Sequence, residues 1–394
     1  MKYSNLLLAA LATTALTFTA CGGGGTTAAG GTPAAGGDNP IVTTSTLAGD
    51  ITTDMRLTAD KIWIIDGLVA VKNGATLTIE PGTTLAGKDG TGASTSYMVI
   101  DKGSKIIANG TAAKPIIFTS KKAVDGEAGA VGQWGGLTII GNAANDQVDP
   151  YEVNEEFVAG TSDMADNSGS LKYVKILNSG ITMQKDKEIN GLSLVGVGSG
   201  TTIENITVDK SDDDGIEIWG GTVNLTNVKI TNCTDDYFDI DDGYSGTVKN
   251  LTVITTTGNA GIEMSGDTAA TFDGFNITIG ADQVKEGGIY FKKDGIGGTF
   301  KNGIITDNAS NSTYGAIHSI GNAVIANVNF ENVKLAGSNS AKFTNGVKKD
   351  ESGNVTNADY GSRVELEAKF NAGSLTDQNY APVFETLSGE ITTN

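Results

Sequence analysis

The sequence is poor in the residues that build disulfides, histidine-based catalytic triads and zinc sites. Among 394 residues it has two cysteines, Cys21 and Cys233, one histidine, His318, and two arginines. Because Cys21 directly follows a predicted signal peptide and is expected to be acylated, Cys233 has no free thiol to pair with. We therefore expect the stability of the chain to come from packing and backbone hydrogen bonds, and we expect no histidine-based site.

Positive charge is also scarce. The chain carries 27 lysines and arginines against 46 aspartates and glutamates, for a formal net charge of -19. A surplus of negative charge of this size argues against binding to nucleic acid and against an electrostatic hold on anionic lipid. It favours solubility and the binding of cations.

The N-terminus has the pattern of an export signal. The apolar stretch at residues 6–16 is too short to span a bilayer comfortably. It leads to Phe-Thr-Ala-Cys at residues 18–21, which resembles a lipobox, where a signal peptidase cleaves before an acylated cysteine. We predict a lipoprotein signal peptide at residues 1–20 and lipidation of Cys21. An ordinary cleaved signal, giving a secreted or periplasmic protein, is the alternative.

The residues after the predicted lipid attachment site form a tether. Gly22–Gly37 consists almost entirely of Gly, Thr and Ala, a composition that buries no core and behaves as a flexible coil. We predict a flexible tether at residues 21–40 and a single folded domain at residues 41–394. Since Gly22 is no inner-membrane retention signal, we expect the lipid to anchor the protein at the outer membrane or the cell surface.

A six-residue pattern recurs through the second half of the chain: apolar, any, Asn, apolar, any, apolar, with Gly for Asn in one copy. A second short strand pattern, inward-outward-inward, lies between the copies and includes Ile216–Ile218 and Phe238–Ile240. The hexamers begin at intervals of 22 to 28 residues and are Ile203–Val208, Leu225–Ile230, Val248–Val253, Phe272–Ile277, Phe300–Ile305 and Ile325–Phe330, with a looser copy at Leu171–Ile176.

The period decides between repeat architectures. A propeller blade needs about 40 residues, and leucine-rich repeats need more Leu. Coils of about two dozen residues with short strands predict an all-β fold, a right-handed parallel β-helix. Asn tolerates a left-handed backbone, so the Asn of each hexamer predicts a tight corner and an asparagine ladder along one edge. Covers are expected at residues 42–66 and about 350–394, because an open end exposes strand edges.

The N-terminal half repeats in a different form. Three segments share the order strand, polar pair, Gly turn, strand: Val71–Leu77, Ile79–Leu85 and Ile100–Ile106. Residues 144–170 interrupt the rhythm with seven acids and no basic residue. A long insertion of this kind is often functional, and a solvated bulge is the equal alternative.

Several of these motifs are similar to those of a known family. Leu77–Thr84, Trp134–Leu137, Asp213–Glu217 and Gly220–Val223 resemble segments of bacterial surface lipoproteins with right-handed parallel β-helices. This resemblance covers most of the chain beyond the tether. It implies the architecture of the pectate-lyase-like superfamily, which includes polysaccharide lyases and hydrolases, and suggests sugar polymers by analogy alone.

The second strands predict a file of acidic side chains. If Ile216, Phe238, Ile262 and Ile289 are equivalent inward positions, the residue after each of them projects outward, and these residues form one column with a spacing of about 4.8 Å. The column consists of Glu217, Asp239, Glu263 and Tyr290. Asp213 and Asp235 are expected in a neighbouring column, with Asp214 and Asp236 in the next. Crowded oxygen ligands suit Ca²⁺, so the predicted metal ligands are Asp213, Asp214, Glu217, Asp235, Asp236, Asp239 and Glu263. Turn-forming aspartates on a solvated face are the alternative.

Aromatic residues share this region. Tyr237, Tyr290, Trp219 and Tyr244 are candidates for stacking against a carbohydrate if their rings point outward. The competing interpretation is that they cover the surface of the solenoid. The Trp-Gly-Gly turn favours a structural role for Trp219, as it does for Trp134.

Three functions remain open from the sequence. We favour a non-catalytic, lipid-anchored surface module that binds glycan, matrix or another protein, with Ca²⁺ as the one candidate cofactor. A polysaccharide lyase or glycoside hydrolase acting on an acidic polysaccharide is the enzymatic alternative, with Asp239, Glu263 and Lys292 as candidate catalytic residues. A spacer or adhesin stalk is the third. Apart from its own lipid anchor, we expect a glycan or surface protein as partner and no nucleic acid.

Overall fold

The computed structural model describes residues 43–144, 151–185, 187–280, 285–292, 296–310, 314–320, 327–346, 348–349, 355–357 and 363–373. The predicted signal peptide, Cys21 and the predicted tether lie outside the described residues. None of the helices within these ranges is long and apolar enough to cross a membrane.

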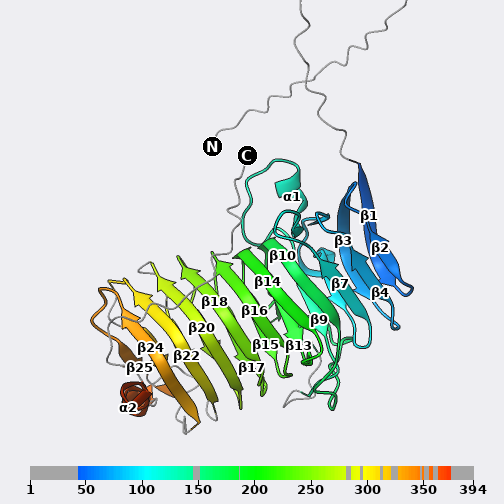
Figure 1. Ribbon diagram of the computed structural model, residues 1–394. Coiled ribbons are helices and arrows are strands. Elements are labelled where there is room, and N and C mark those ends of the chain that lie inside the picture. The colour runs from blue at the N-terminus through cyan, green and yellow to red at the C-terminus, as the bar shows by residue number, and fades with distance from the viewer. Residues whose placement is uncertain are drawn as a thin grey trace, which may run out of the picture. The chain divides into compact units, whose positions relative to one another are not determined.

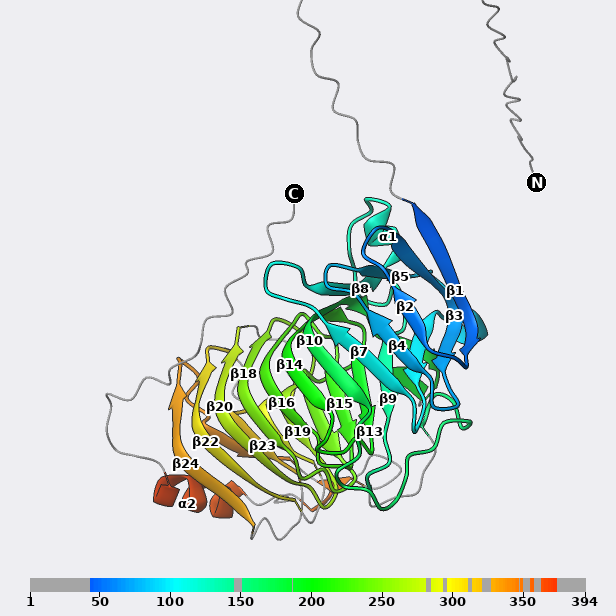
Figure 2. The same ribbon diagram turned by 45° about the vertical axis from the view of Figure 1, so that its right-hand side comes forward.

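From residue 44 onward the chain winds as a right-handed parallel β-helix, which confirms the predicted fold class (Figure 1). Parallel pairing joins 23 of the described strands into one continuous sheet. Successive coils lie side by side along the solenoid in both views (Figure 2).

Two rows of strands make up most of the solenoid. The long-strand face consists of β10 (Gly169–Ser179), β14 (Thr202–Ser211), β16 (Asn224–Thr231), β18 (Thr247–Thr255), β20 (Ala269–Ile279), β22 (Gly297–Asp307) and β24 (Val328–Ala336). The short-strand face consists of β6 (Tyr97–Ile100), β9 (Leu137–Ile140), β13 (Leu192–Val195), β15 (Ile216–Trp219), β17 (Phe238–Asp241), β19 (Ala260–Met264), β21 (Gly287–Phe291), β23 (Ile317–Ser319) and β25 (Phe343–Asn345).

The remaining elements form the first coils, two hairpins and three short helices. The first coils contain β1 (Thr44–Ile51), β2 (Met55–Leu57), β3 (Ile62–Val71), β4 (Thr76–Ile79), β5 (Thr84–Gly87), β7 (Lys105–Asn109) and β8 (Ile116–Ser120). The antiparallel hairpins are β11 (Ile181–Gln184) with β12 (Lys187–Ile189) and β26 (Lys348–Lys349) with β27 (Val355–Asn357). The helices are η1 (Gly92–Ser94), α1 (Lys121–Val124) and α2 (Arg363–Gly373).

The asparagine of each hexamer bends a long strand at a corner. Asn205, Asn227, Asn250 and Asn302 have φ values between 54° and 59°, in the left-handed region that Asn tolerates. The Asn227 amide donates to Asn205 Oδ1 at 3.0 Å, and the Asn250 amide donates to Asn227 Oδ1 at 2.9 Å. The predicted asparagine ladder is therefore present along this edge.

The last copy of the hexamer was wrongly placed by the sequence pattern. Phe300 pairs with Phe330, so the step is 30 residues and the repeat begins at Phe330 instead of Ile325. Asn332, with φ 56°, donates to Asn302 Oδ1 at 3.0 Å and takes the ladder position expected for Asn327. A longer connection between β22 and β24 shifted the register, which spacing alone did not reveal.

The two ends of the solenoid are closed in different ways. β1 and β2 pair in parallel with β3 and β4, so residues 44–57 form the first coil themselves instead of a separate cover. At the other end, α2 packs Leu366 and Phe370 into the core, where the Phe370 ring lies 5.5 Å from that of Phe330. The helix covers the last coil and so protects the strand edges that an open end of the solenoid would expose.

Candidate functional site: an acidic pocket on the short-strand face

The predicted acidic column exists. Glu217 pairs with Asp239, Asp239 with Glu263, and Glu263 with Tyr290 in adjacent parallel strands. Ile216 and Ile262 beside them are fully buried in the core, so the alternation of the strands sends the acids to the outer side. The next residue of the file after Tyr290 is His318.

A second file runs through the turns that precede these strands. The backbone N–H of Asp214 donates to Asn190 Oδ1 at 3.2 Å, and that of Asp236 donates to Asp214 Oδ1 at 2.8 Å. The N–H of Ala260 in turn donates to Asp236 Oδ1 at 2.5 Å. Each acidic or amide side chain thus accepts from the next coil, which fixes Asp214 and Asp236 at one place along the solenoid.

These two files line a polar pocket of about 490 Å³. Its walls contain almost no apolar surface. Its lining residues are Glu152, Thr182, Glu188, Asp212, Asp213, Asp214, Glu217, Thr234, Asp235, Asp236, Asp239, Asn259, Lys285 and Lys292.

Two insertions raise the wall of the pocket on its N-terminal side. The described part of the acidic insertion, from Tyr151 onward, is not a solvated bulge, because Tyr151 and Phe157 are buried against the outer side of β9 and β13. This packing places Glu152 in the pocket wall. The β11–β12 hairpin adds Glu188 beside it.

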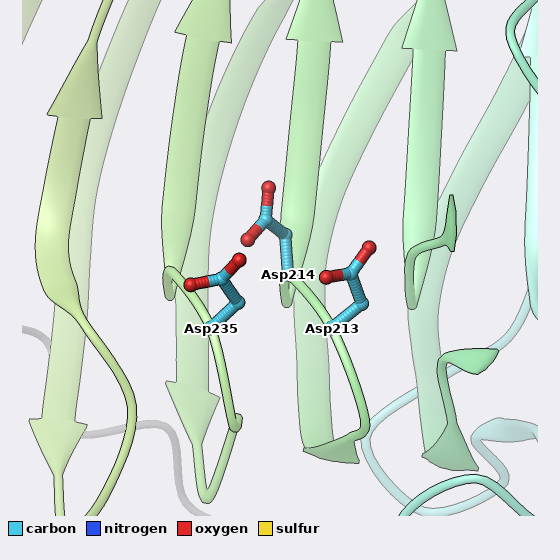
Figure 3. A group of neighbouring side chains, drawn as sticks. All are labelled: Asp213, Asp214 and Asp235. Carbon is cyan, nitrogen blue, oxygen red and sulfur yellow. The ribbon is translucent and has the colours of Figure 1, made fainter. Parts of the chain in front are cut away.

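The carboxylates gather in three groups, in each of which one oxygen per residue lies within 4.8 Å of the others. The outer group is Asp213, Asp214 and Asp235, drawn in Figure 3, where the first two come from one turn and Asp235 from the next coil. The middle group is Asp214, Glu217 and Asp239, and the third group is Asp236, Glu263 and Glu286. All seven predicted metal ligands fall into these groups.

Asp239 is, with Asp214, one of two buried carboxylates in the middle group. The residue is 8% exposed, and its Oδ1 atom is buried without a hydrogen-bond partner among the described residues. A buried carboxylate oxygen without a partner costs about 1–3 kcal/mol. A cation or a proton at Asp239 would compensate for this cost.

Burial and mutual repulsion raise the pKa of most of these carboxyl groups. The pKa values of Asp214, Glu217 and Asp239 lie well above their usual range, first because of burial and then because of the neighbouring carboxylates. Burial and the nearby Asp235 raise the pKa of Asp213 to about 8. Asp213 consequently keeps its proton at pH 7 in the absence of a cation.

Lys292 sits at the C-terminal side of the pocket and is paired. Its Nζ donates to Glu263 Oε1 at 2.6 Å, and the Glu263 side chain is 2% exposed. Burial opposes the charge of the lysine, but the attraction of Glu263 outweighs it and raises the pKa of Lys292 above its usual range. An ammonium held in this way is a poor general base at neutral pH.

The predicted outward aromatic face is wrong for two of its four members. Tyr237 and Tyr244 are fully buried in the core, where the Tyr244 hydroxyl donates to the Val223 carbonyl at 2.8 Å. Both residues flank turns, and their rings turn inward at the corner instead of following the strand alternation.

The other two predicted aromatic residues lie outside the core but are covered. Tyr290 occupies the outer column, is 3% exposed and stacks on His318 with a centroid distance of 5.4 Å. The half-buried Trp219 ring packs edge-on against Tyr151 at 6.0 Å. Trp134 is buried, and its indole N–H donates to the Leu177 carbonyl at 2.9 Å. No exposed stacking platform is formed by these residues.

Six residues that line the pocket and two that contact its carboxylates were not singled out from the sequence. The lining residues are Thr182, Glu188, Asp212, Thr234, Asn259 and Lys285, and the other two are Asn190 and Glu286. One signal for Asn190 was present, because Asn190-Gly191-Leu192 and Asp214-Gly215-Ile216 share one pattern on consecutive coils. Asn259 and Glu286 continue the file of Asp213 and Asp235 on the next two coils, as the pairing of Asp239 with Glu263 and of Ala260 with Gly287 implies, so the repeat also carried a signal for them.

Asp212 and Thr234 likewise share one position on consecutive coils, where the Thr234 hydroxyl donates to Asp212 Oδ1 at 3.2 Å. The positions of Thr182 and Glu188 depend on how the β11–β12 hairpin folds, and that of Lys285 depends on the connection before β21.

Comparison with known proteins gives a family and little else. The family model described as pectate-lyase-like β-helix domain matches residues 49–381. No curated protein matches the sequence.

Two solved structures show weak likeness. The enzymatically active domain of tailspike protein 2 from bacteriophage CBA120 is 14% identical with a TM-score of 0.37, covering 71% of this chain and 39% of that one. Full-length tailspike protein 2 from an Escherichia coli O157:H7 bacteriophage is 12% identical with a TM-score of 0.31, covering 71% and 35%. The chain thus spans well under half of either tailspike protein, and likeness at this level carries no argument about activity. By the match of the family model over most of its length, this chain belongs to the pectate-lyase-like β-helix domain family.

Proposed function

We propose that this chain is a lipid-anchored cell-surface β-helix that binds Ca²⁺ in the middle carboxylate group and, through that ion, an anionic or hydroxyl-rich ligand such as a glycan. The observation that carries the proposal is the buried Oδ1 of Asp239, which has no hydrogen-bond partner among the described residues and belongs to a side chain grouped with Asp214 and Glu217. Ca²⁺ accepts six to eight oxygen ligands in irregular geometry, which three carboxylates and added water or ligand oxygens supply.

The composition of the pocket supports this choice of ion. Its lining offers carboxylate and amide oxygens, and the one cysteine among the described residues, Cys233, is buried in the core. Soft ions that need sulfur or imidazole therefore have no suitable ligands here. Mg²⁺ demands near-ideal octahedral geometry and keeps its water, so we expect it to bind more weakly than Ca²⁺.

Recognition of a ligand would depend on coordination and hydrogen bonding. The pocket walls are polar, and the tyrosines expected to stack are buried. A glycan with carboxylate or vicinal hydroxyl groups would complete the coordination of the ion. The predicted acyl chain on Cys21 would hold the module at the outer membrane or cell surface.

The direct test is calcium binding measured by isothermal titration calorimetry on the chelator-treated protein. We expect binding of Ca²⁺ that is tighter than that of Mg²⁺, and its loss or at least tenfold weakening in Asp239→Asn. Asp267→Asn is the matched control, because Asp267 is an exposed turn residue outside the pocket. Absence of calcium binding, or equal binding by both variants, would refute the cation site.

Glycan binding and anchoring need separate measurements. A glycan array probed with and without Ca²⁺ tests the ligand, and we expect any signal to disappear with EDTA and in Asp239→Asn. Radiolabelled palmitate incorporation, absent in Cys21→Ser, tests the anchor. Signal peptidase cleavage without incorporation would instead indicate a secreted protein.

Catalysis is the second candidate, and one observation favours it. Burial and then the nearby Glu188 raise the pKa of Glu152 to about 7, and burial and then Glu263 do the same for Glu286. A carboxyl group with such a pKa can serve as a general acid at neutral pH. The paired state of Lys292 argues against its use as a lyase base. Incubation with acidic polysaccharides, followed by assay for unsaturated products and new reducing ends, tests this candidate. Activity abolished by Asp239→Asn or Glu263→Gln would establish an enzyme.

A further inference from the structure

The third carboxylate group differs from the other two because it already contains a positive charge. Asp236, Glu263 and Glu286 bring one oxygen each within 4.8 Å of the others, as the proposed calcium ligands do. The Lys292 ammonium lies 2.6 Å from Glu263 Oε1. The Glu263 side chain is 2% exposed, whereas that of Lys292 is 46% exposed, so the lysine reaches over the buried acid from the open side of the pocket.

We infer that Lys292 is a tethered cation that occupies the third carboxylate group, excludes a metal ion from it, and so limits the number of ions that the pocket binds. The inference rests on the proposed function for the identity of the competing ion. It concerns a different set of carboxylates from the proposed calcium site.

The fold positions the Lys292 ammonium beside the third carboxylate group. Lys292 directly follows β21, and its backbone N–H donates to the Met264 carbonyl at 3.0 Å, which fixes it one coil beyond Glu263. From this position the side chain extends back across one coil spacing, about 4.8 Å. The sheet thus holds the backbone of Lys292 next to the third carboxylate group.

Charge balance explains why the lysine matters. Three carboxylates in one buried group repel one another strongly unless a cation compensates. The ammonium also attracts Asp236 and Asp239 across the pocket. A metal ion entering the third group would have to displace Lys292 and would then be repelled by it, because like charges at this range disfavour each other.

Removing the ammonium should therefore open a new cation site. We expect Lys292→Met to bind one Ca²⁺ more per chain than the wild-type protein, measured by calorimetry and by equilibrium dialysis. Lys285→Met is the matched control: Lys285 lines the same pocket and its loss changes the net charge equally, but it does not hold Glu263. Its stoichiometry should equal that of the wild type, and the added site should vanish in the double variant Lys292→Met/Glu263→Gln.

The outcomes separate this inference from the calcium proposal. An added ion in Lys292→Met alone supports the inference, even if the wild-type protein binds none and the calcium proposal fails. A folded Lys292→Met variant with the stoichiometry of the wild type overturns the inference, whether or not the wild type binds calcium. An added ion in Lys285→Met as well would also overturn it, because the effect would then follow from net charge.

A measurement on the wild-type protein covers the case in which Lys292→Met does not fold. Acylation of lysines by acetic anhydride at mildly alkaline pH requires the neutral amine, and modification is quantified by mass spectrometry of peptides. We expect Lys292 to react at least tenfold more slowly than the exposed Lys102, because its proton is held by Glu263. Equal rates would contradict a tethered cation.

Discussion

Asp239→Asn should have opposite effects on thermal stability in the absence and in the presence of calcium. The substitution keeps the shape of the side chain but removes the charge from a residue that is 8% exposed. Without a cation, the wild-type protein buries an Asp239 oxygen that has no hydrogen-bond partner in the described part of the chain, on a strand between those of Glu217 and Glu263. An amide supplies two donors to these acceptors and creates no repulsion.

The expected magnitudes follow from these contacts. Relief of one unsatisfied buried polar atom is worth about 1–3 kcal/mol, so we expect Asp239→Asn to be more stable than the wild type in EDTA by about that amount. With Ca²⁺ at 100 times its dissociation constant, binding stabilises the wild type by about 2.7 kcal/mol. The variant loses a charged ligand and most of this gain, so the order of the two proteins reverses or the difference disappears.

Differential scanning fluorimetry in EDTA and in a calcium series measures the effect. For a chain of this size, 1 kcal/mol corresponds to roughly 2–4 °C or less in Tm. We compare apparent Tm values because a long repeat array need not unfold in one step. Asp267→Asn, with the same change of charge in an exposed turn, should follow the wild type in both conditions. An equal calcium-induced Tm shift in Asp239→Asn and the wild type would refute the reasoning.

Three further predictions concern the pocket and the solenoid. The folded-state pKa of Asp213 is raised from 3.8 to about 8, and that of Glu286 to about 7, so folding without metal takes up protons. The apparent Tm in EDTA should therefore fall as pH rises from about 4 to 8. A Tm that rises over this range would be inconsistent with buried carboxyl groups. Saturating Ca²⁺ should flatten this profile. Asn227→Ala should lower the free energy of unfolding, measured by urea denaturation, by about 1–3 kcal/mol, because it removes two ladder hydrogen bonds and strains a backbone with φ 58°. An unchanged denaturation midpoint would show that the ladder is dispensable. Gly303→Ala should lower Tm by several degrees, because its Cβ would overlap the Phe275 ring, and an unaltered Tm would indicate that the ring moves freely.

The periodicity of the sequence was sufficient for the architecture. Each hexamer encodes a strand, a corner and a strand, and neighbouring coils pair in the register that the pattern implies, as Ile203 with Leu225 and Leu225 with Val248. A one-residue shift would turn every apolar side chain outward, so register is strongly specified by burial. The acidic column followed from this register, because Glu217, Asp239 and Glu263 each stand between two inward residues.

Tertiary structure decided everything that depends on irregular connections. The step to the last coil and the entry of Glu152 and Glu188 into the pocket depend on segments without a repeat. The inward rings of Tyr237 and Tyr244 depend on packing at turns, where strand alternation does not apply. The sequence by itself determined the coiling of the chain and the file of acids, because periodic burial and backbone pairing are local rules repeated many times. Whether those acids form a flat face or a pocket with a lysine at its opening depended on long-range packing of inserted loops, which no local rule specifies.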